Sequence, residues 1–393
     1  MSLLPVAEAQ ARLLGMASAL PLEDVPLAQA VGRWVGQDIP ALRSQPALDL
    51  SAMDGYAIRY DDIAGPWRII GESAAGGAFS GSIGASEALR IYTGAAVPQG
   101  ADTVIVQEDV ARDGDQLTLI GDGPGSMGRH IRKAGSDFTE GRTIIPVGTG
   151  LSTRHIALAA LAGHGTLPLP RLPRIALLSS GSELVPPGES LRVDQIPASN
   201  GVMLQAMLAA LPCEAVDLGI IPDDLTTLTA CLADLTEHDI VVTTGGASVG
   251  DHDLVKPALE AAGGAIDFWK IAMRPGKPLI SGRLGNALFL GLPGNPVSAF
   301  VTATLFLLPL ARKMAGCFSP LPGIEKAMLD SDMPKVGGRE DYVRGAVRNG
   351  TVSPVHTQDS AATYALALAN CLIRRPAGSG PAHAGEQVEI LPL

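Results

Sequence analysis

The middle of the chain consists of uninterrupted apolar runs separated by amphipathic segments. The runs of strand length are RIALLSS from residue 174, EAVDLGII from 214, DIVVTTGG from 239, AIDFWKIA from 265 and ALFLGL from 287. Helical segments lie between them: SNGVMLQAMLAAL, with Ser199 or Asn200 placed as its cap, PDDLTTLTACLADLTE, and DLVKPALEAAG. Another helix is expected after Pro296. This alternation predicts a doubly wound α/β domain with a parallel sheet covered on both faces.

The segments on either side have a different pattern. Short β-like runs alternate with Gly-rich turns in YAIRY, WRIIGES, ALRIYTG, DTVIVQEDV and QLTLIG, which predicts an inserted all-β domain over residues 46–145. The runs DYVRGAVRNG, CLIRRP and EQVEILPL predict a C-terminal β-barrel over residues 318–393. Helical VAEAQARLLGMASAL and STRHIALAALAGHG belong to a predicted elongated N-terminal domain, residues 1–45 plus 146–172, which ends in the Pro-punctuated linker LPLPRLPR. The α/β domain is then residues 173–317.

Composition and charge exclude several classes of protein. The formal net charge is −11, whereas a nucleic-acid partner requires a basic face. The four cysteines form no CxxC pair, which favours a reducing, cytoplasmic location. No basic segment with a following apolar stretch begins the chain, so no signal peptide is predicted. The longest apolar run, residues 297–311, is too short for a membrane span and is interpreted as a buried helix.

The carboxyl end of the strand at residue 240 offers a candidate ligand site. VVTTGGASVGDHD places Thr244, Gly245, Gly246 and Ser248 where open α/β sheets bind ligands. Glycines let a backbone approach an anion closely. The spacing is neither GxGxxG nor that of a P-loop, so a dinucleotide-binding fold and a P-loop ATPase are disfavoured. Taken alone, the string is more simply explained by a strand-to-helix turn without a ligand.

Two further loops could bind anions. In FWKIAMRPGKP, Lys270, Arg274 and Lys277 lie within eight residues of a Pro-stiffened segment, a set that suits phosphate or another oxyanion. A solvated turn is the alternative. GLPGNPVSAF contains Pro293, Gly294, Asn295 and Pro296. Asn295 as N-cap and Pro296 as first helical residue explain a helix start without any function, yet a helix N-terminus is also a ready anion site.

Scattered acids complete the set of candidates, and each has an ordinary structural explanation when taken alone. Asp54 lies in the turn MDGYA and Asp137 ends KAGSD, while Asp223 and Asp253 could cap or begin helices. Glu183 follows the first strand of the α/β domain. The seven histidines have no ligand-like spacing, so neither a zinc-protease site nor a Ser–His–Asp set is indicated.

Seven of these strings, taken together, resemble the molybdopterin molybdenumtransferase (MoeA) family, which includes the E domain of the receptor scaffold gephyrin. SAMDGYA, IYTGAAVPQGAD, IRKAGSD, SSGSEL, TTGGASVGD, FWKIAMRPGKP and GLPGNPVSAF occur in the order and at the spacing of that family, over essentially the whole chain. The resemblance implies a four-domain protomer, a homodimer, and a reaction in which adenylated molybdopterin and molybdate give molybdenum cofactor and AMP with Mg²⁺. It also implies hand-over from an upstream adenylyltransferase and delivery to acceptor molybdoenzymes.

The resemblance also implies roles for individual residues. Those it assigns to catalysis are Asp54, Thr93, Asp137, Glu183, Asp223 and Asp253, of which Asp54, Glu183, Asp223 and Asp253 are candidate metal ligands. Those it assigns to substrate or anion binding are Thr244, Gly245, Gly246, Ser248, Lys270, Arg274, Lys277, Pro293, Gly294, Asn295, Pro296, Arg339, Arg344 and Ser360. Because the family places the insert of one subunit against the α/β domain of the other, the site should be composite.

This chain departs from the family pattern at three positions. Ser182 stands where an acid is frequent, and Arg274 stands where a Lys also occurs. Ala361 stands where Gly is common, and this difference weakens the match in the last domain.

Two other functions remain compatible with parts of the sequence. The α/β domain alone resembles molybdopterin adenylyltransferases, but these lack the insert with MDGYA and TGA. A gephyrin-like interaction scaffold is the other alternative, and the absence of a fused second domain and a long linker argues against it.

Overall fold

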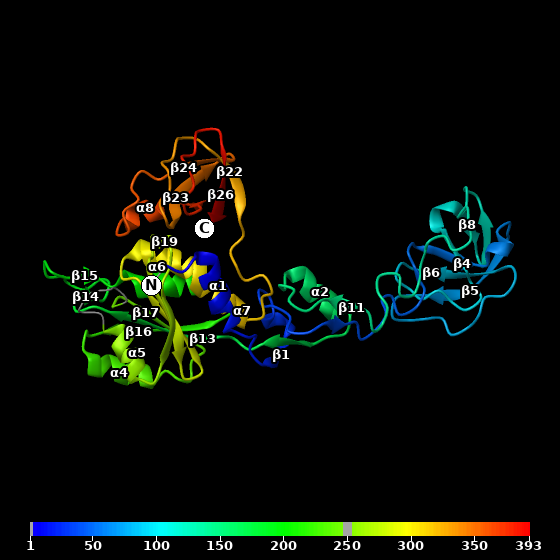
Figure 1. The fold of residues 1–393 in the computed structure, drawn as a ribbon. Coiled ribbons are helices and arrows are strands. Elements are labelled where there is room, and N and C mark those ends of the chain that lie inside the picture. Colours follow the sequence, from blue (N-terminus) through cyan, green and yellow to red (C-terminus); the bar gives the residue numbers. More distant parts are fainter. Residues whose placement is uncertain (1–2, 247–253) are drawn as a thin grey trace.

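Figure 1 shows an elongated chain with an α/β unit at one end, a β-barrel beside it and a separate β-sheet unit at the far end. The computed structural model describes residues 3–246 and 254–393. The predicted mixture of a central α/β unit, an inserted β unit and a C-terminal barrel is confirmed.

The α/β unit is built on a six-stranded sheet. Its spatial order is β16 (Glu214–Ile221), β13 (Arg174–Ser180), β17 (Ile240–Thr244), β21 (Ala287–Leu292), β20 (Pro278–Leu284) and β18 (Ala265–Lys270). The first four strands are parallel, as predicted. The prediction of an all-parallel sheet is wrong for β20, which was not predicted as a strand and is antiparallel to both of its neighbours, β21 and β18. Only two residues, Gly285 with φ +58° and Asn286, separate β20 from β21, and so short a loop can only form a hairpin.

Helices cover both faces of this sheet, and the strands contribute alternate residues to each face. Leu177 and Val242 pack toward α3 (Ser199–Leu208) and α6 (Pro296–Thr302). Leu178 and Val241 pack toward α4 (Leu225–Ala233) and α5 (Val255–Ala261). Both sides of β13, β17 and β21 are therefore buried, which explains why these three strands have continuous apolar sequences rather than an alternating pattern. A short parallel pair, β14 (Leu184–Val185) with β15 (Ile196–Pro197), projects beside the sheet.

The helix after Pro296 is longer than the predicted apolar run. It continues through a π-helical segment, η4 (Ala303–Leu307), into α7 (Leu308–Met314). Pro309 cannot donate to the carbonyl of Leu305, and that carbonyl instead accepts from Gln10 Nε2 at 2.9 Å. Gln10 lies on α1 (Val6–Gly15), which packs on the same core. By length and composition Pro296–Met314 could cross a membrane, but 78% of it is buried here, which confirms the prediction of a core helix.

A narrow connecting region joins the α/β unit to the insert. It contains β1 (Leu22–Pro26), η1 (Leu27–Gln29), β2 (Ile39–Pro40), β11 (Thr143–Ile145), α2 (Thr153–Leu161) and β12 (Thr166–Pro170). The prediction that LPLPRLPR is only a linker is wrong, because residues 166–170 form β12, antiparallel to β1. A two-stranded ribbon offers each strand an unpaired edge, so prolines at 168 and 170 are tolerated there. The chain enters the insert through β3 (Leu50–Ser51) and leaves through β10 (Ile131–Arg132), which pair with each other.

The insert and the barrel complete the fold. The insert sheet runs β7 (Thr103–Val106), β4 (Gly55–Ile58), β6 (Glu87–Ile91), β5 (Trp67–Ser73), β9 (Gln116–Leu119) and β8 (Val110–Asp113), with turns η2 (Tyr60–Asp62) and η3 (Gln107–Asp109). The barrel closes through β23 (Glu340–Arg348), β24 (Thr351–Pro354), β22 (Glu325–Leu329), β26 (Gln387–Pro392) and β25 (Cys371–Arg375), which pairs again with β23. It also carries α8 (Thr363–Ala367), and β19 (Met273–Arg274) of the α/β unit pairs with β23.

Candidate active site

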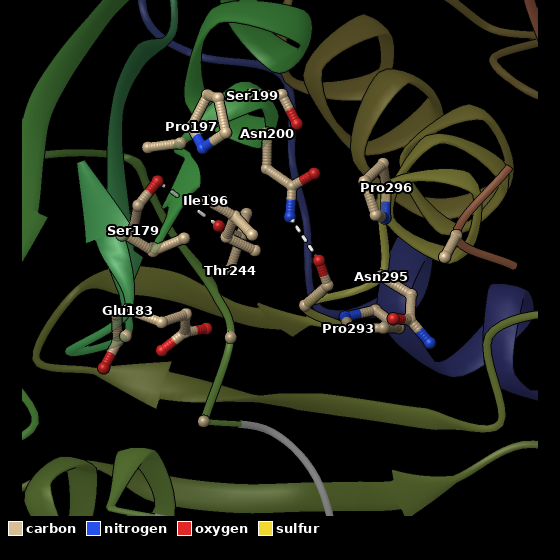
Figure 2. A pocket seen from close by; sticks show the side chains of 18 of the residues that line it. Ser179, Glu183, Ile196, Pro197, Ser199, Asn200, Thr244, Pro293, Asn295 and Pro296 are labelled. Atoms are coloured by element: carbon tan, nitrogen blue, oxygen red, sulfur yellow. Dashed lines mark hydrogen bonds between the residues drawn. The ribbon is translucent and has the colours of Figure 1, made fainter. Parts of the chain in front are cut away.

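A cavity of about 750 Å³ lies at the carboxyl ends of the parallel strands. Ser179 and Ser180 end β13, Thr244 ends β17, and all three line it, as Figure 2 shows in part. The Thr244 hydroxyl lies 3.4 Å from that of Ser179. The location is that of ligand sites in open α/β sheets, because the strands end there and their connecting loops diverge. Predicted residues Thr244, Gly245 and Gly246 are thus brought to one cavity.

The two glycines after β17 form a turn whose backbone conformation residues with a side chain rarely adopt. Gly245 has φ +86° and Gly246 φ +58°. A Cβ on Gly245 would lie 2.1 Å from the carbonyl oxygen of Ser180. The turn therefore needs glycine for conformation and for space, and it exposes backbone rather than side chain to the cavity.

Two of the predicted acids line the same cavity. Asp223 accepts from Ser180 Oγ at 2.6 Å and from the backbone N–H of Ser182 at 3.1 Å, so its orientation is fixed. Glu183 lies in the following loop and is exposed. The neighbouring Asp224 caps α4 by accepting from Thr227 N at 2.8 Å, so the cap of that helix is Asp224 and not Asp223.

The PGNP loop forms the opposite wall. Pro293, Gly294, Asn295 and Pro296 all line the cavity, and Pro296 begins α6 as predicted. Asn295 occupies the N-cap position, but the expected side-chain cap is absent. Its Nδ2 instead donates to Ser360 Oγ at 3.0 Å, and the carbonyl of Ser360 accepts from Val297 N at 3.1 Å. A barrel loop therefore sits on the helix N-terminus.

Asn200 is held in the same wall. The prediction that Ser199 or Asn200 caps α3 with its side chain is wrong, because the helix begins at Ser199 and Ala198 occupies the N-cap. Asn200 Nδ2 donates to the Gly294 carbonyl at 2.7 Å, which ties α3 to the PGNP loop (Figure 2). Its side chain is buried, so this long-range contact replaces the local cap.

A second, cation-lined cavity of about 440 Å³ lies between the α/β unit and the barrel. Arg274, Lys277, Arg339 and Ser360 line it, which brings predicted residues from two units together, and Pro278 lines both cavities. Lys270 lies on β18 and lines neither of the two. The Arg274 guanidinium forms an ion pair with Asp341 at 2.5 Å.

Arg344, also predicted to bind anions, is 1% exposed, and its backbone N–H donates to Gln358, which lines this cavity. Its guanidinium donates to the carbonyls of Asp359 at 2.8 Å and Thr357 at 2.9 Å. Gln358 returns two bonds, to the carbonyls of Arg344 and Val355. Within the described residues, these contacts place Arg344 as a support for the loop that carries Ser360 rather than in the cavity.

The remaining predicted residues lie in the insert or outside the described residues. Asp54 precedes β4 and Thr93 follows β6, and they meet where these adjacent strands begin and end, with Asp54 Oδ1 accepting from Thr93 N at 2.7 Å and from Thr93 Oγ1 at 2.8 Å. These bonds hold the pKa of Asp54 below its usual range. Asp137 is exposed near the connecting region. Ser248 and Asp253 lie outside the described residues.

In one chain the insert lies at the opposite end of the molecule from the α/β unit (Figure 1), whose residues line most of the cavity. Asp54 and Thr93 therefore do not reach the cavity of their own chain. Sequence reasoning also missed Ser180 and Asn200 as cavity residues. Ser180 could have been found from its place at the end of an apolar strand, whereas nothing local in the sequence indicates Asn200.

Three family descriptions match the chain in succession. They are the MoeA N-terminal region (domain I and II) over residues 4–163, the probable molybdopterin binding domain over 176–313, and the MoeA C-terminal region (domain IV) over 326–393. A molybdopterin molybdenumtransferase from Haemophilus influenzae is 36% identical over 376 residues, 93% of each chain. Molybdopterin molybdenumtransferase 2 from Mycobacterium tuberculosis is 33% identical over 384 residues, 94% of each chain. The crystal structure of a molybdopterin biosynthesis protein MoeA from Pyrococcus horikoshii is 30% identical, with a TM-score of 0.88 over 100% of this chain and 99% of that one.

Proposed function

The chain belongs to the MoeA family of molybdopterin molybdenumtransferases, and from this premise we propose that it inserts molybdenum from molybdate into adenylated molybdopterin with release of AMP. The observation that carries the proposal is the cavity at the strand ends, where the glycine turn, two acids and the PGNP loop meet beside a cation-lined cavity. Such a pair of adjoining cavities suits a reaction between two anions.

Both substrates require compensation of negative charge. The adenylated substrate contains a phosphoanhydride and molybdate is a dianion, so each must be held by cations and N–H donors. Arg274, Lys277 and Arg339 supply the cations. Gly245 and Gly246 present backbone to the neighbouring cavity. Ser360 lies between the two cavities, because its hydroxyl accepts from Asn295 while it also lines the cationic one.

The acids of the cavity suit a bound Mg²⁺. Among the described residues, no three His, Cys, Asp or Glu side chains gather into a metal site. Mg²⁺ is commonly held by one or two carboxylates together with substrate phosphates, and Glu183 and Asp223 fit that requirement. When bound, the ion would stabilise negative charge on the leaving phosphate. Asp253 and Asp54 remain further candidate ligands.

We further propose a homodimer in which the insert of one subunit completes the cavity of the other. The support is the position of Asp54 and Thr93 in an insert that lies at the far end of its own chain from the α/β unit. Closed two-fold assembly would bring each insert to the opposite cavity, so both sites would be completed in the same way.

Complementation between two inactive variants tests the composite site. Asp54→Asn damages only the insert contribution, and Glu183→Gln only the cavity contribution. In a purified heterodimer of the two variants, one site receives both intact halves, so roughly half of wild-type activity should return. Each homodimer alone should be nearly inactive. A heterodimer as inactive as its parents, or a sedimenting monomer that turns over, would refute the composite site.

The activity itself is tested with purified protein, adenylated molybdopterin, molybdate and Mg²⁺. We expect release of AMP that requires molybdate, with incorporation of molybdenum into the pterin product. A parallel reaction with ATP and molybdopterin covers the adenylyltransferase alternative. Turnover only in that second reaction would contradict the proposal, and turnover in neither would leave the scaffold alternative.

The surroundings of the reaction follow from the same proposal. We place the protein in the cytoplasm, supported by four cysteines that all remain free thiols. Burial raises the pKa of Cys213 and of Cys371 to about 11, so these two thiols stay protonated and unreactive. The upstream adenylyltransferase and acceptor molybdoenzymes are the proposed partners for substrate hand-over and product delivery.

A further inference from the structure

Arg90 lies on β6, beside the two turns that carry Asp54 and Thr93. The proposed reaction assigns no role to Arg90. Its guanidinium carbon lies 5.1 Å from the centroid of the Tyr56 ring and 4.9 Å from that of Tyr92. Tyr56 is buried and Tyr92 is 37% exposed, so the guanidinium contacts one ring in the core and one at the surface. Cation–π contacts of this kind restrain the guanidinium plane.

The hydrogen bonds of Arg90 reach two segments that adjoin Asp54. Nη2 donates to Gln107 Oε1 at 2.6 Å, and Nη1 donates to the carbonyl of Gly55 at 3.3 Å. Gly55 directly follows Asp54. The backbone N–H of Gln107 donates to the carbonyl of Asp54 at 3.2 Å. Arg90 therefore connects the ends of three strands, β4, β6 and β7, at the point where Asp54 emerges.

The backbone under Asp54 has little room to adjust. Gly55 lies between Ile91 and Val106 in the sheet register, and a Cβ on Gly55 would lie 1.9 Å from the carbonyl oxygen of Ile105. Packing against the two neighbouring strands thus fixes the start of β4 at Gly55. The turn above it, residues 92–94, is held through Asp54 itself, through Gly94 N to the Ser51 carbonyl at 2.9 Å, and through the contact of Tyr92 with Arg90.

We propose that Arg90 is a positioning residue for the reaction: it holds the Asp54–Thr93 pair in the geometry that the insert presents to substrate. The inference rests on the proposed function, since it assigns Asp54 a place at the reacting groups. The competing explanation is that Arg90 only stabilises the insert sheet. If Arg90 is a positioning residue, its loss should disturb only the turn around Asp54 and should lower activity through Asp54. If Arg90 only stabilises the sheet, its loss should disturb the whole insert.

Hydrogen exchange without substrate provides the first test. In Arg90→Ala, we expect faster exchange confined to residues 53–56 and 92–95, including the Thr93 amide that donates to Asp54. The matched control is Arg68→Ala, which removes another arginine from the same sheet. Its side chain is 71% exposed and pairs with Glu87 at 2.7 Å, away from the turn. Faster exchange throughout the insert in Arg90→Ala would support the purely structural explanation and overturn the proposal.

Steady-state kinetics provide the second test. Arg90→Ala should lower kcat by roughly tenfold to a hundredfold with KM nearly unchanged, the scale for a displaced reacting group. Arg90→Lys keeps the charge between the rings but loses the forked donation, so an intermediate kcat is expected. It also decides the matter should Arg90→Ala fail to fold. Arg68→Ala should match wild type.

A double variant separates this proposal from the proposed function. If Arg90 acts through Asp54, then Arg90→Ala added to Asp54→Asn should lower the residual kcat by less than about twofold. Losses that multiply, or a wild-type kcat in Arg90→Ala, would overturn the positioning role. An inactive wild-type enzyme would instead refute the proposed function, and the exchange measurement would still decide whether Arg90 orders the Asp54 turn.

Discussion

The guanidinium of Arg274 in the α/β unit lies 2.5 Å from the carboxylate of Asp341 in the barrel. Arg274 remains 62% exposed in its side chain, whereas Asp341 is only 10% exposed. The two residues are also backbone partners in the parallel pairing of β19 with β23. Arg274 therefore serves the contact between two units and faces the cation-lined cavity, so its substitution affects both.

This pairing determines which cation gives the clean test of anion binding. Arg274→Glu would place a second carboxylate against the nearly buried Asp341, so it should lower both the melting temperature and substrate affinity. Lys277 is exposed and has no carboxylate within 4.0 Å among the described residues. Lys277→Glu should weaken binding of the adenylated substrate by about tenfold, more at low salt, and leave the melting temperature unchanged.

Titration calorimetry at two salt concentrations beside a thermal melt measures both quantities. Lys326→Glu is the control, because Lys326 is an exposed lysine on β22 of the barrel. Equal loss of affinity in both variants would show that only the overall charge matters and would contradict the anion site.

Asp54→Asn should remove function without removing stability. The side chain is exposed in a turn, so the melting temperature should change little. Loss of its charge should lower AMP release by about a hundredfold or more, the scale of acid–base and electrostatic groups. The initial rate of AMP release measures this, with Asp113→Asn on exposed β8 as control. Wild-type turnover in Asp54→Asn would show that the turn is structural.

Arg344→Met should act on stability instead. The change removes the two hydrogen bonds that the buried guanidinium donates to the carbonyls of Thr357 and Asp359, and a hydrogen bond from a charged group is worth about 1.5–3 kcal/mol. We expect the free energy of unfolding to fall by about 2–4 kcal/mol in denaturant titration. Arg339→Ala, in contrast, should leave stability nearly unchanged and weaken substrate binding. The reverse pattern would exchange the roles of the two arginines.

Gly245→Ala and Gly294→Ala form a matched pair in the same cavity. The added methyl at Gly245 would meet the Ser180 carbonyl at 2.1 Å in a left-handed conformation, whereas at Gly294 its nearest neighbour would be Gly245 Cα at 3.4 Å. The first variant should therefore lose substrate binding and about 2 kcal/mol or more of stability, while the second should retain its stability. Calorimetric binding and thermal melts of the pair check this, and equal tolerance at both positions would refute the tight turn.

Acidification below pH 4 should weaken the segments around Asp49 and Lys133, where the chain enters and leaves the insert. The side-chain bond from Lys133 at 2.8 Å, followed by the Ala134 N–H, holds the pKa of Asp49 below its ordinary 3.8. Because the folded pKa is depressed, the stabilisation is complete above pH 3.8 and is lost as pH falls through the lower folded value. Exchange of residues 49–51 and 131–134 should therefore rise below pH 4 in wild type, whereas Asp49→Asn should show no such step.

The sequence predicted β13 and β17 well because each of these buried runs is long, apolar and bounded by turn residues, whereas β20 was not predicted. It could not predict side-chain partners chosen by the folded arrangement. Asn200 and Asn295 are both good local caps, yet they bond to Gly294 and Ser360, 94 and 65 residues away. Arg344 and Arg339 carry the same charge, and the sequence does not distinguish their roles. Only the fold shows that Arg344 is buried and supports a loop, whereas Arg339 lines the cavity.

The paired strands β3 and β10 have a consequence for how this architecture changes over generations. The two ends of the insert leave the host side by side, at the spacing of neighbouring strands, about 4.8 Å. A segment whose ends meet can be lost, gained or exchanged by recombination without moving the host fold. Transplanting residues 50–132 from a relative should therefore yield a folded chimaera. The two parts of the proposed site, one in the insert and one in the host, can therefore evolve at different rates.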